Sequence, residues 1–162
     1  MLLLKIYYHL LCLVKTLAYK LIYGKAFQMP LNSTYRAGFH LVIEKPYGGV
    51  KIGNNCFFNN YCTLAARAGI TIGDGTLFGE NVKVYDHNHC YKDRRLPIKE
   101  QGYTAAPVSI GKHCWIGSHV VILKGVTIGD YCVIGAGCVI HQDVPGGSVV
   151  VCKQDRIIRH PS

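Results

Sequence analysis

Acidic residues are scarce in this sequence of 162 residues, which has nine aspartates and glutamates against eighteen lysines and arginines, a formal net charge of +9. Such an excess of positive charge favours anionic partners, for example a phosphate-bearing small molecule or an acidic membrane surface. Nucleic acid would also qualify, but the sequence carries no recognised nucleic-acid-binding motif, so we do not expect nucleic acid as a partner. Charged residues of both signs make up only 17%, with 18 glycines. This composition argues against a helical bundle or a disordered tail and favours a turn-rich β architecture.

The sequence also lacks a convincing signal-peptide cleavage site, because charged residues resume after the apolar start without a small-residue cleavage motif. A chain of 162 residues is enough for one domain with a substantial core, and no second domain is expected. We therefore expect a single-domain protein of the cytoplasm.

A six-residue repeat runs without a break from Ile110 to Pro145. Its hexads are IGKHCW, IGSHVV, ILKGVT, IGDYCV, IGAGCV and IHQDVP, each with isoleucine in the first place and cysteine or valine in the fifth. A helix would need apolar spacings of three and four, and a single strand would alternate by two, so a period of six fits neither alone. The period is typical of a parallel β-helix, in which stacked rungs bury the isoleucines in one continuous core.

Weaker hexads precede this run, from Ile52 to His89, and we expect the β-helix domain to cover residues 28–151 with an irregular first coil over 28–50. The hexads predict a narrow aliphatic core. They are interrupted by a two-residue slip at Ile70 and Thr71, which predicts a small insertion at a corner of the coil.

Cysteine is abundant, with eight residues, but the pattern does not predict disulfides. Five of the eight occupy the fifth hexad place, where a small apolar side chain is wanted: Cys56, Cys62, Cys114, Cys132 and Cys138. Cysteine serves well as a small buried hydrophobe. Reduced buried thiols favour a reducing cytoplasm.

Residues 1–27 predict a helix that breaks at Gly24, with a wide apolar arc and a narrow polar stripe. The segment is about long enough to span a bilayer, but its interior lysines make spanning costly. Two interpretations remain open. Residues 1–23 lie along an anionic membrane surface, on its inner face, or the helix packs against its own prism or a neighbouring subunit.

A loop over residues 90–109 interrupts the repeat between His89 and Ile110. In a stack of coils such an insertion must leave through a corner. The loop is polar, basic and aromatic, and a long ordered loop in a compact domain is usually functional. We expect it to form part of a binding site.

The run WIGSHVVILKGVTIGDYCVIGAGCVI is similar to the acyltransferases of the left-handed β-helix, or hexapeptide-repeat, family, particularly the sugar O-acetyltransferases that act on maltose and galactosides. The resemblance covers roughly residues 50 to 160. It implies an all-β, left-handed parallel β-helix. It also implies transfer of an acetyl group from acetyl-coenzyme A to a hydroxyl of a sugar or glycan precursor, as in cell-surface polysaccharide O-acetylation, by a homotrimer whose sites are each shared between two prisms. No metal is expected.

The stretch Asp86-His87-Asn88-His89 precedes the loop and carries the candidate base. Acetyl transfer to a hydroxyl needs a group that accepts the hydroxyl proton near neutral pH, and imidazole is suited to that task. In the resemblance His89 matches the catalytic histidine, and His87 remains a rival. Asp86 is a candidate to hydrogen-bond a ring nitrogen and fix the tautomer.

The resemblance also implies binding residues. Asn59 matches a position that contacts the acceptor sugar, and we expect Tyr85 and Arg94 to contact it too. The related enzymes carry acidic residues shortly after Asn59, where this chain has Ala65, Ala66 and Arg67, so a different acceptor is predicted. The residues expected to bind coenzyme A are Trp115, Ser118 and Ala136 along the pantetheine arm, and Lys153, Arg156 and Arg159 of the basic segment 152–162 for its phosphates.

Two other functions are alternatives to acetyl transfer. The first is a zinc-dependent carbonic anhydrase on the same fold, which would use histidines such as His87, His89, His113 and His119. The characteristic spacing of that group is not present. The second is a non-catalytic trimeric scaffold, which the DHNH stretch and the loop argue against.

Overall fold

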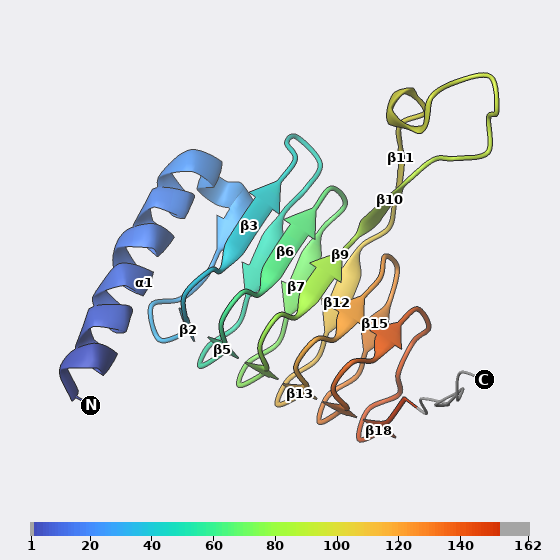
Figure 1. Cartoon of the computed structure of the whole chain (residues 1–162). Helices are drawn as coiled ribbons and strands as arrows, with labels where there is room; N and C mark the ends of the chain where they lie inside the picture. The colour runs from blue at the N-terminus through green and yellow to red at the C-terminus, as the bar shows by residue number, and fades with distance from the viewer. Residues whose placement is uncertain (1, 153–162) are drawn as a thin grey trace, which may run out of the picture.

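The computed structural model describes residues 2–152, and the side chains from residue 6 onward. The chain winds into a stack of triangular coils, with one helix across the first coil and one hairpin projecting from an edge (Figure 1). The parallel β-helix predicted from the hexads is confirmed.

Three parallel sheets form the faces of the prism, which we name A, B and C in the order in which the chain visits them. Face A consists of β1 (Phe27–Gln28), β4 (Val50–Ile52), β7 (Ile70–Ile72), β12 (Val108–Ile110) and β15 (Thr127–Ile128). Face B consists of β2 (Thr34–Tyr35), β5 (Phe57–Phe58), β8 (Leu77–Phe78), β13 (Trp115–Ile116), β16 (Val133–Ile134) and β18 (Val149–Val150). Face C consists of β3 (His40–Ile43), β6 (Thr63–Ala66), β9 (Lys83–Tyr85), β14 (Val121–Ile122) and β17 (Val139–Ile140).

The rungs stack in register, so that equivalent residues of successive coils lie above one another. On face A, Ile52 pairs with Ile72, Ile72 with Ile110, and Ile110 with Ile128. All six isoleucines of the uninterrupted repeat are buried, and so are the five cysteines of the fifth hexad place. Apolar burial of this kind is the main stabilising contribution in a narrow prism.

The core is not aliphatic throughout. In the first coils the inward positions hold aromatic rings, and Phe58 stacks on Phe78 with centroids 4.4 Å apart, while Tyr35 stacks on Phe39 at 4.3 Å. The expectation of an aliphatic core therefore holds only for the coils from β12 onward, because phenylalanine replaces isoleucine in the earlier hexads.

A column of buried donors explains why small polar side chains recur at the edge between faces A and B. Each donates to a carbonyl of the next coil at 2.7–3.2 Å, in the pairs Ser33 to Gly53, Cys56 to Gly73, Thr76 to Gly111, Cys114 to Gly129 and Cys132 to Pro145. A serine, threonine or cysteine there fills the narrow corner and also satisfies a carbonyl oxygen of the turn.

The slip in the repeat lies at a different place from the one the hexads predicted. Ile70 and Thr71 belong to β7, in register with Val50 and Lys51, and Ile70 is buried. The two additional residues instead lengthen β6, whose Ala65 and Ala66 pair with residues of β3 before the chain turns through residues 67–69. The sequence pattern does not locate these two additional residues, because an isoleucine at position 70 fits a strand equally well in either register.

Helix α1 (Leu2–Tyr23) lies against the first coil and is followed by a 3-10 turn, Gly24–Ala26. It ends where the sequence predicted, and Gly24 has φ +58°, a conformation that glycine adopts readily. Cys12 and Thr16 are buried on its inner side, and Thr16 Oγ1 donates to the Tyr35 hydroxyl at 3.1 Å. Burial raises the pKa of that tyrosine. The helix thereby closes the open end of the core, as terminal elements of repeat proteins must.

The hairpin consists of β10 (His87–His89) and β11 (Tyr103–Ala105), which pair antiparallel, with a short 3-10 helix (Ile98–Glu100) in the segment between them. It leaves the prism at the edge between faces C and A (Figure 1). Its stem begins at His87, and Val108 and Ser109 already belong to face A. Within residues 2–152 no helix is long and apolar enough to cross a membrane.

Candidate functional site

Asp86 is the structural centre of the hairpin's base. It follows β9, and its side chain is 0% exposed. Its two carboxylate oxygens accept hydrogen bonds of 2.6–2.9 Å from the backbone N–H groups of Arg67, Ala68 and Gly69. These are the residues of the turn that follows the lengthened strand β6. The carboxylate thus replaces the carbonyl oxygens that usually satisfy such groups in a turn.

His87 completes the bonding of this carboxylate. Its Nδ1 lies 2.9 Å from Oδ1 of Asp86, and its side chain is 17% exposed. A carboxylate that accepts three backbone N–H groups is an acceptor, so Nδ1 carries the hydrogen and Nε2 is left as the acceptor nitrogen of the ring. The pair therefore has the geometry of a general base held by a buried carboxylate.

Tyr103 of β11 contacts side chains of both the hairpin and the prism. Its ring lies edge-on to His87, with centroids 5.6 Å apart, and against His89 at 4.3 Å. The guanidinium carbon of Arg67 lies 3.5 Å from the centre of the same ring. Arg67 is in turn paired with Glu44 of the preceding coil. This chain of contacts fixes the orientation of the hairpin beside the two histidines.

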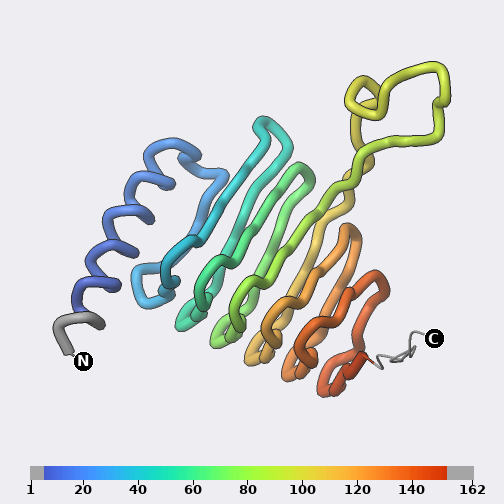
Figure 2. The backbone as a smooth tube through the Cα atoms, in the orientation of Figure 1, coloured from blue at the N-terminus to red at the C-terminus, as the bar shows by residue number. Residues whose placement is uncertain are grey.

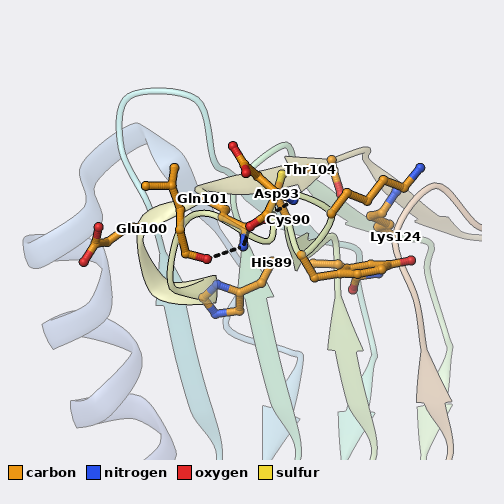
Figure 3. A pocket seen from close by; sticks show the side chains of 11 residues that line it. His89, Cys90, Asp93, Glu100, Gln101, Thr104 and Lys124 are labelled. Atoms are coloured by element: carbon orange, nitrogen blue, oxygen red, sulfur yellow. Dashed lines mark hydrogen bonds between the residues drawn. The ribbon is translucent and has the colours of Figure 1, made fainter.

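His89 faces a hollow of about 720 Å³ that the hairpin encloses with the neighbouring turn of the prism. The lining includes Glu100, Thr104 and Lys124 together with Asn88, His89 and residues of the loop. Figure 3 shows Gln101 reaching across this hollow to the backbone of Asp93, with Glu100 and Lys124 on opposite sides of it. The mixture of amide, hydroxyl, carboxylate and ammonium groups suits a hydroxyl-rich ligand.

The two candidate bases differ in what holds them. His87 is partly buried and bonded to Asp86, whereas His89 is exposed and contacts the Tyr103 ring without a hydrogen bond to its ring nitrogens among the described residues. His89, however, lines the hollow, and His87 does not.

Two of the residues predicted to bind coenzyme A lie on another edge of the prism. Ser118 and Ala136 occupy stacked turns between faces B and C, and the Ser118 hydroxyl accepts a hydrogen bond from the backbone N–H of Glu80. Trp115 points outward from face B and is exposed. In one chain, face C therefore separates these residues from the Asp86 and His87 pair.

The predicted acceptor residues are also divided between the two edges. Asn59 lies on the edge of Ser118, where its Oδ1 accepts from the backbone N–H of Asn60. Tyr85 ends β9 directly before Asp86, and Arg94 is exposed in the loop outside the residues that line the hollow. Lys153, Arg156 and Arg159 lie outside the described residues.

No three potential metal ligands gather anywhere in residues 2–152. His113 stacks on Tyr131 at the edge between faces A and B, and His119 Nδ1 lies 3.0 Å from the side-chain nitrogen of Asn81 at the edge between B and C. The four histidines considered for a zinc site are thus spread over three edges of the prism.

The roles of Glu44 and Arg67 were not predicted from the sequence. A signal for their pairing exists, because β3 and β6 stack in register up to Ile43 and Ala66, which places the next residue of each coil side by side. The contact of Arg67 with Tyr103 has no such signal, since it depends on the direction in which the hairpin leaves.

Comparison with known proteins gives consistent relatives. Residues 107–142 match the family described as bacterial transferase hexapeptide, six repeats. Nodulation protein L of Rhizobium leguminosarum bv. viciae is 42% identical over 130 residues, which cover 78% of this chain and 64% of that protein. Galactoside O-acetyltransferase of Escherichia coli K12 is 39% identical over 115 residues, 70% of this chain and 55% of that protein. This chain therefore spans less than two thirds of the length of these relatives.

Among solved structures, a hexapeptide-repeat-containing acetyltransferase of Vibrio cholerae O1 biovar eltor, complexed with acetyl-coenzyme A, is similar with a TM-score of 0.67 at 31% identity. The match covers 86% of this chain and 72% of that one. The resemblance predicted from the hexads is confirmed by this similarity.

Proposed function

Because the chain belongs to the hexapeptide-repeat acetyltransferase family, we propose that it transfers the acetyl group of acetyl-coenzyme A to a hydroxyl group of a sugar or glycan precursor. The observation that carries the proposal is the buried Asp86 carboxylate bonded to Nδ1 of His87 at 2.9 Å. The named activity of the galactoside O-acetyltransferase and the acetyl-coenzyme A complex of the Vibrio cholerae protein support the choice of acceptor and donor.

We assign the base to His87 and a positioning role to Asp86. Sequence counting favoured His89, but a base needs a fixed tautomer and a fixed ring, and only His87 has a carboxylate partner among the described residues. In this assignment His89 contacts the acceptor from the wall of the hollow that it lines.

The reaction is then a direct transfer within a ternary complex. Nε2 of His87 accepts the proton of the acceptor hydroxyl while the oxygen attacks the thioester carbonyl carbon. The tetrahedral intermediate collapses, the carbon–sulfur bond breaks, and the imidazolium returns the proton to the departing thiolate. The products are the acetyl ester and free coenzyme A, and no acyl-enzyme is formed.

The donor site is proposed to lie along Trp115, Ser118 and Ala136, where small residues leave room for the pantetheine arm. Face C separates this edge from His87 in one chain, so a neighbouring copy would have to bring its own edge to the base. The apolar outward residues of face B support such an assembly, since Leu77, Trp115 and Val149 are all exposed. We propose a homotrimer whose sites are shared between two prisms.

The acceptor is proposed to place its reacting hydroxyl at Nε2 of His87 and the rest of the molecule in the neighbouring hollow beneath the hairpin. There Asn88 and Thr104 offer hydrogen-bonding groups, and Lys92 and Lys124 are cations. A glycan precursor that carries phosphate, such as one used in cell-surface polysaccharide synthesis, would satisfy both kinds of group. We propose that the protein acts in the cytoplasm, which its eight free cysteines support.

The proposal is tested by following coenzyme A release from acetyl-coenzyme A with a panel of sugars, sugar nucleotides and lipid-linked sugars. We expect release that depends on one class of acceptor, and a loss of about 100-fold or more in kcat for His87→Ala. His89→Ala should act mainly on the KM for the acceptor. Equal kcat for wild type and His87→Ala would contradict the assignment of the base, and absence of acceptor-dependent release with every sugar would contradict the proposed activity.

A further inference from the structure

The outward side of α1 is covered by apolar side chains along its whole described length. Ile6, Tyr7, Leu10, Leu11, Val14, Leu17, Leu21 and Ile22 are all exposed. At about 100° per residue these positions fall within an arc of roughly 160° that contains no charged side chain. Leu21, near the end of the helix, is 87% exposed.

The apolar side chains of this arc do not hold α1 on the prism. The opposite side of α1 holds the helix in place, with Cys12 and Thr16 buried and Tyr19 Oη donating to the carbonyl of Phe39. In Figures 1 and 2 the helix lies across the end of the stack, and within residues 2–152 no other element lies on its outer side. Exposed apolar surface of this extent marks an interaction site.

The charges of the N-terminal segment indicate which kind of surface would cover the apolar arc of α1. The first 43 residues contain no aspartate or glutamate, but they contain Lys5, Lys15, Lys20, Lys25 and Arg36. Helical geometry places Lys15 at one border of the apolar arc and Lys20 at the other. Lys20 is placed to extend its ammonium group towards lipid headgroups while its stem lies on apolar surface, whereas the ammonium group of Lys15 donates to the carbonyl of Phe39 at 2.6 Å.

A groove of about 490 Å³ runs beside the arc, between α1 and the turn that follows Tyr35. Leu11, Val14 and Ala18 form one side of it, and Lys15 and Arg36 contribute two cations. An apolar wall next to a pair of cations matches an anionic phospholipid, with its phosphate at the cations and its chain along the wall.

We propose that the outer face of α1 docks on the interfacial region of a bilayer that contains anionic phospholipids, with the helix axis parallel to the membrane surface. This inference is independent of the acetyl transfer proposed above. A second copy of α1 is the less favoured occupant, because it would bring two segments with only positive charges against each other.

The test uses the full chain and vesicles of phosphatidylcholine, alone or mixed with phosphatidylglycerol, and measures the bound fraction by sedimentation without any acetyl donor. We expect binding to the mixed vesicles that weakens as salt is raised. Leu21→Glu and Val14→Glu should each reduce the partition coefficient about tenfold or more. Both side chains are exposed, so these variants should keep the melting temperature of the wild type.

Val139→Glu, on face C far from α1, is the matched control, because it introduces the same charge at an exposed valine and should bind as the wild type does. Lys15→Gln together with Lys20→Gln should lower binding to the mixed vesicles only. The proposal is overturned if wild type fails to bind either kind of vesicle, or if the helix variants and Val139→Glu bind equally. It is also overturned if Leu21→Glu reduces the oligomer size and leaves vesicle binding unchanged.

Discussion

The coils from Ile110 to Ile140 and the region around Asp86 are built from the same repeat, but they satisfy their turns in different ways. In the regular coils the turns bond to one another mainly through backbone groups, and an exposed carboxylate such as that of Asp130 accepts from a single turn N–H. The corner glycines leave no space, since a Cβ on Gly117 would lie 2.7 Å from the backbone nitrogen of Ala136. Around Asp86 a buried carboxylate bonds the turn over residues 67–69 and, with the same oxygens, a histidine.

Because of this difference, we expect the regular coils to contribute mainly to the free energy of unfolding and the region around Asp86 to contribute to catalysis. In the regular coils the turns bond to the turns of neighbouring rungs, and none of the carboxylates that join them is bonded to a histidine among the described residues. The lengthened strand β6 shifts one turn, and the carboxylate that satisfies the shifted turn is then available to orient an imidazole. Substitutions in the two regions should therefore affect different measurements.

The largest effect on folding is expected from the regular coils. Ile122 is fully buried on β14, and Ile122→Ala should lower the free energy of unfolding by about 2–5 kcal/mol, because it leaves a cavity in a core with little room to relax. The kcat of the protein that remains folded should stay unchanged. Val121→Ala, on the outward side of the same strand, is the control in denaturant titrations, and an equal loss for both would argue against core packing as the cause.

Asp86→Asn should affect both properties. The amide cannot accept from three N–H groups and a ring nitrogen, so we expect a loss of about 1–3 kcal/mol in stability and of about 100-fold in kcat. Asp130→Asn is a matched control, because Asp130 accepts from the backbone N–H of Lys112 in the regular coils but bonds no histidine. That variant should lose stability alone. Unchanged kcat in Asp86→Asn would show that the carboxylate does not position the base.

Tyr103→Ala should mainly weaken acceptor binding. Loss of the contacts with Arg67 and the two histidines should raise the KM for the acceptor by up to about tenfold, with little change in melting temperature. Tyr103→Phe keeps the ring and should retain the KM of the wild type. Faster amide hydrogen exchange in residues 90–102 of the alanine variant would support a loosened hairpin, and unchanged exchange and KM would contradict it.

The smallest effect at neutral pH is expected from the core thiols. Burial raises the pKa of Cys62 to about 11 from a reference value of 9.0. The unfolded chain loses this proton more readily than the folded one, so the stabilising contribution is complete below pH 9 and is lost as pH rises towards 11. Cys62→Val should flatten the decline of the melting temperature over that range, and an unaltered decline would exclude the thiol as its cause.

The sequence predicted the fold because every rung repeats the same local rule. The register of the isoleucines, the burial of five cysteines and the end of the helix at Gly24 all follow from period, side-chain size and backbone freedom. The slip was misplaced because Ile70 satisfies the inward position of either register, and the aromatic core of the first coils was overlooked although Phe58 and Phe78 occupy isoleucine positions.

Prediction of the site was limited by geometry between coils. The stretch from Asp86 to His89 stood out from the repeat, but counting along the chain cannot tell which histidine meets a carboxylate, because that depends on where the shifted turn lies. The division of the predicted donor and acceptor residues between two edges likewise appears only when the faces are assigned. The place of Lys153, Arg156 and Arg159 remains a prediction from the sequence.

The most direct test of the account is the protonation of the two ring nitrogens of His87, measured by nitrogen-15 chemical shifts of the imidazole in the folded protein. We expect a hydrogen on Nδ1 and none on Nε2 of the neutral ring, and loss of this preference in Asp86→Asn. A hydrogen on Nε2 in the wild type, or the same tautomer in both proteins, would contradict it.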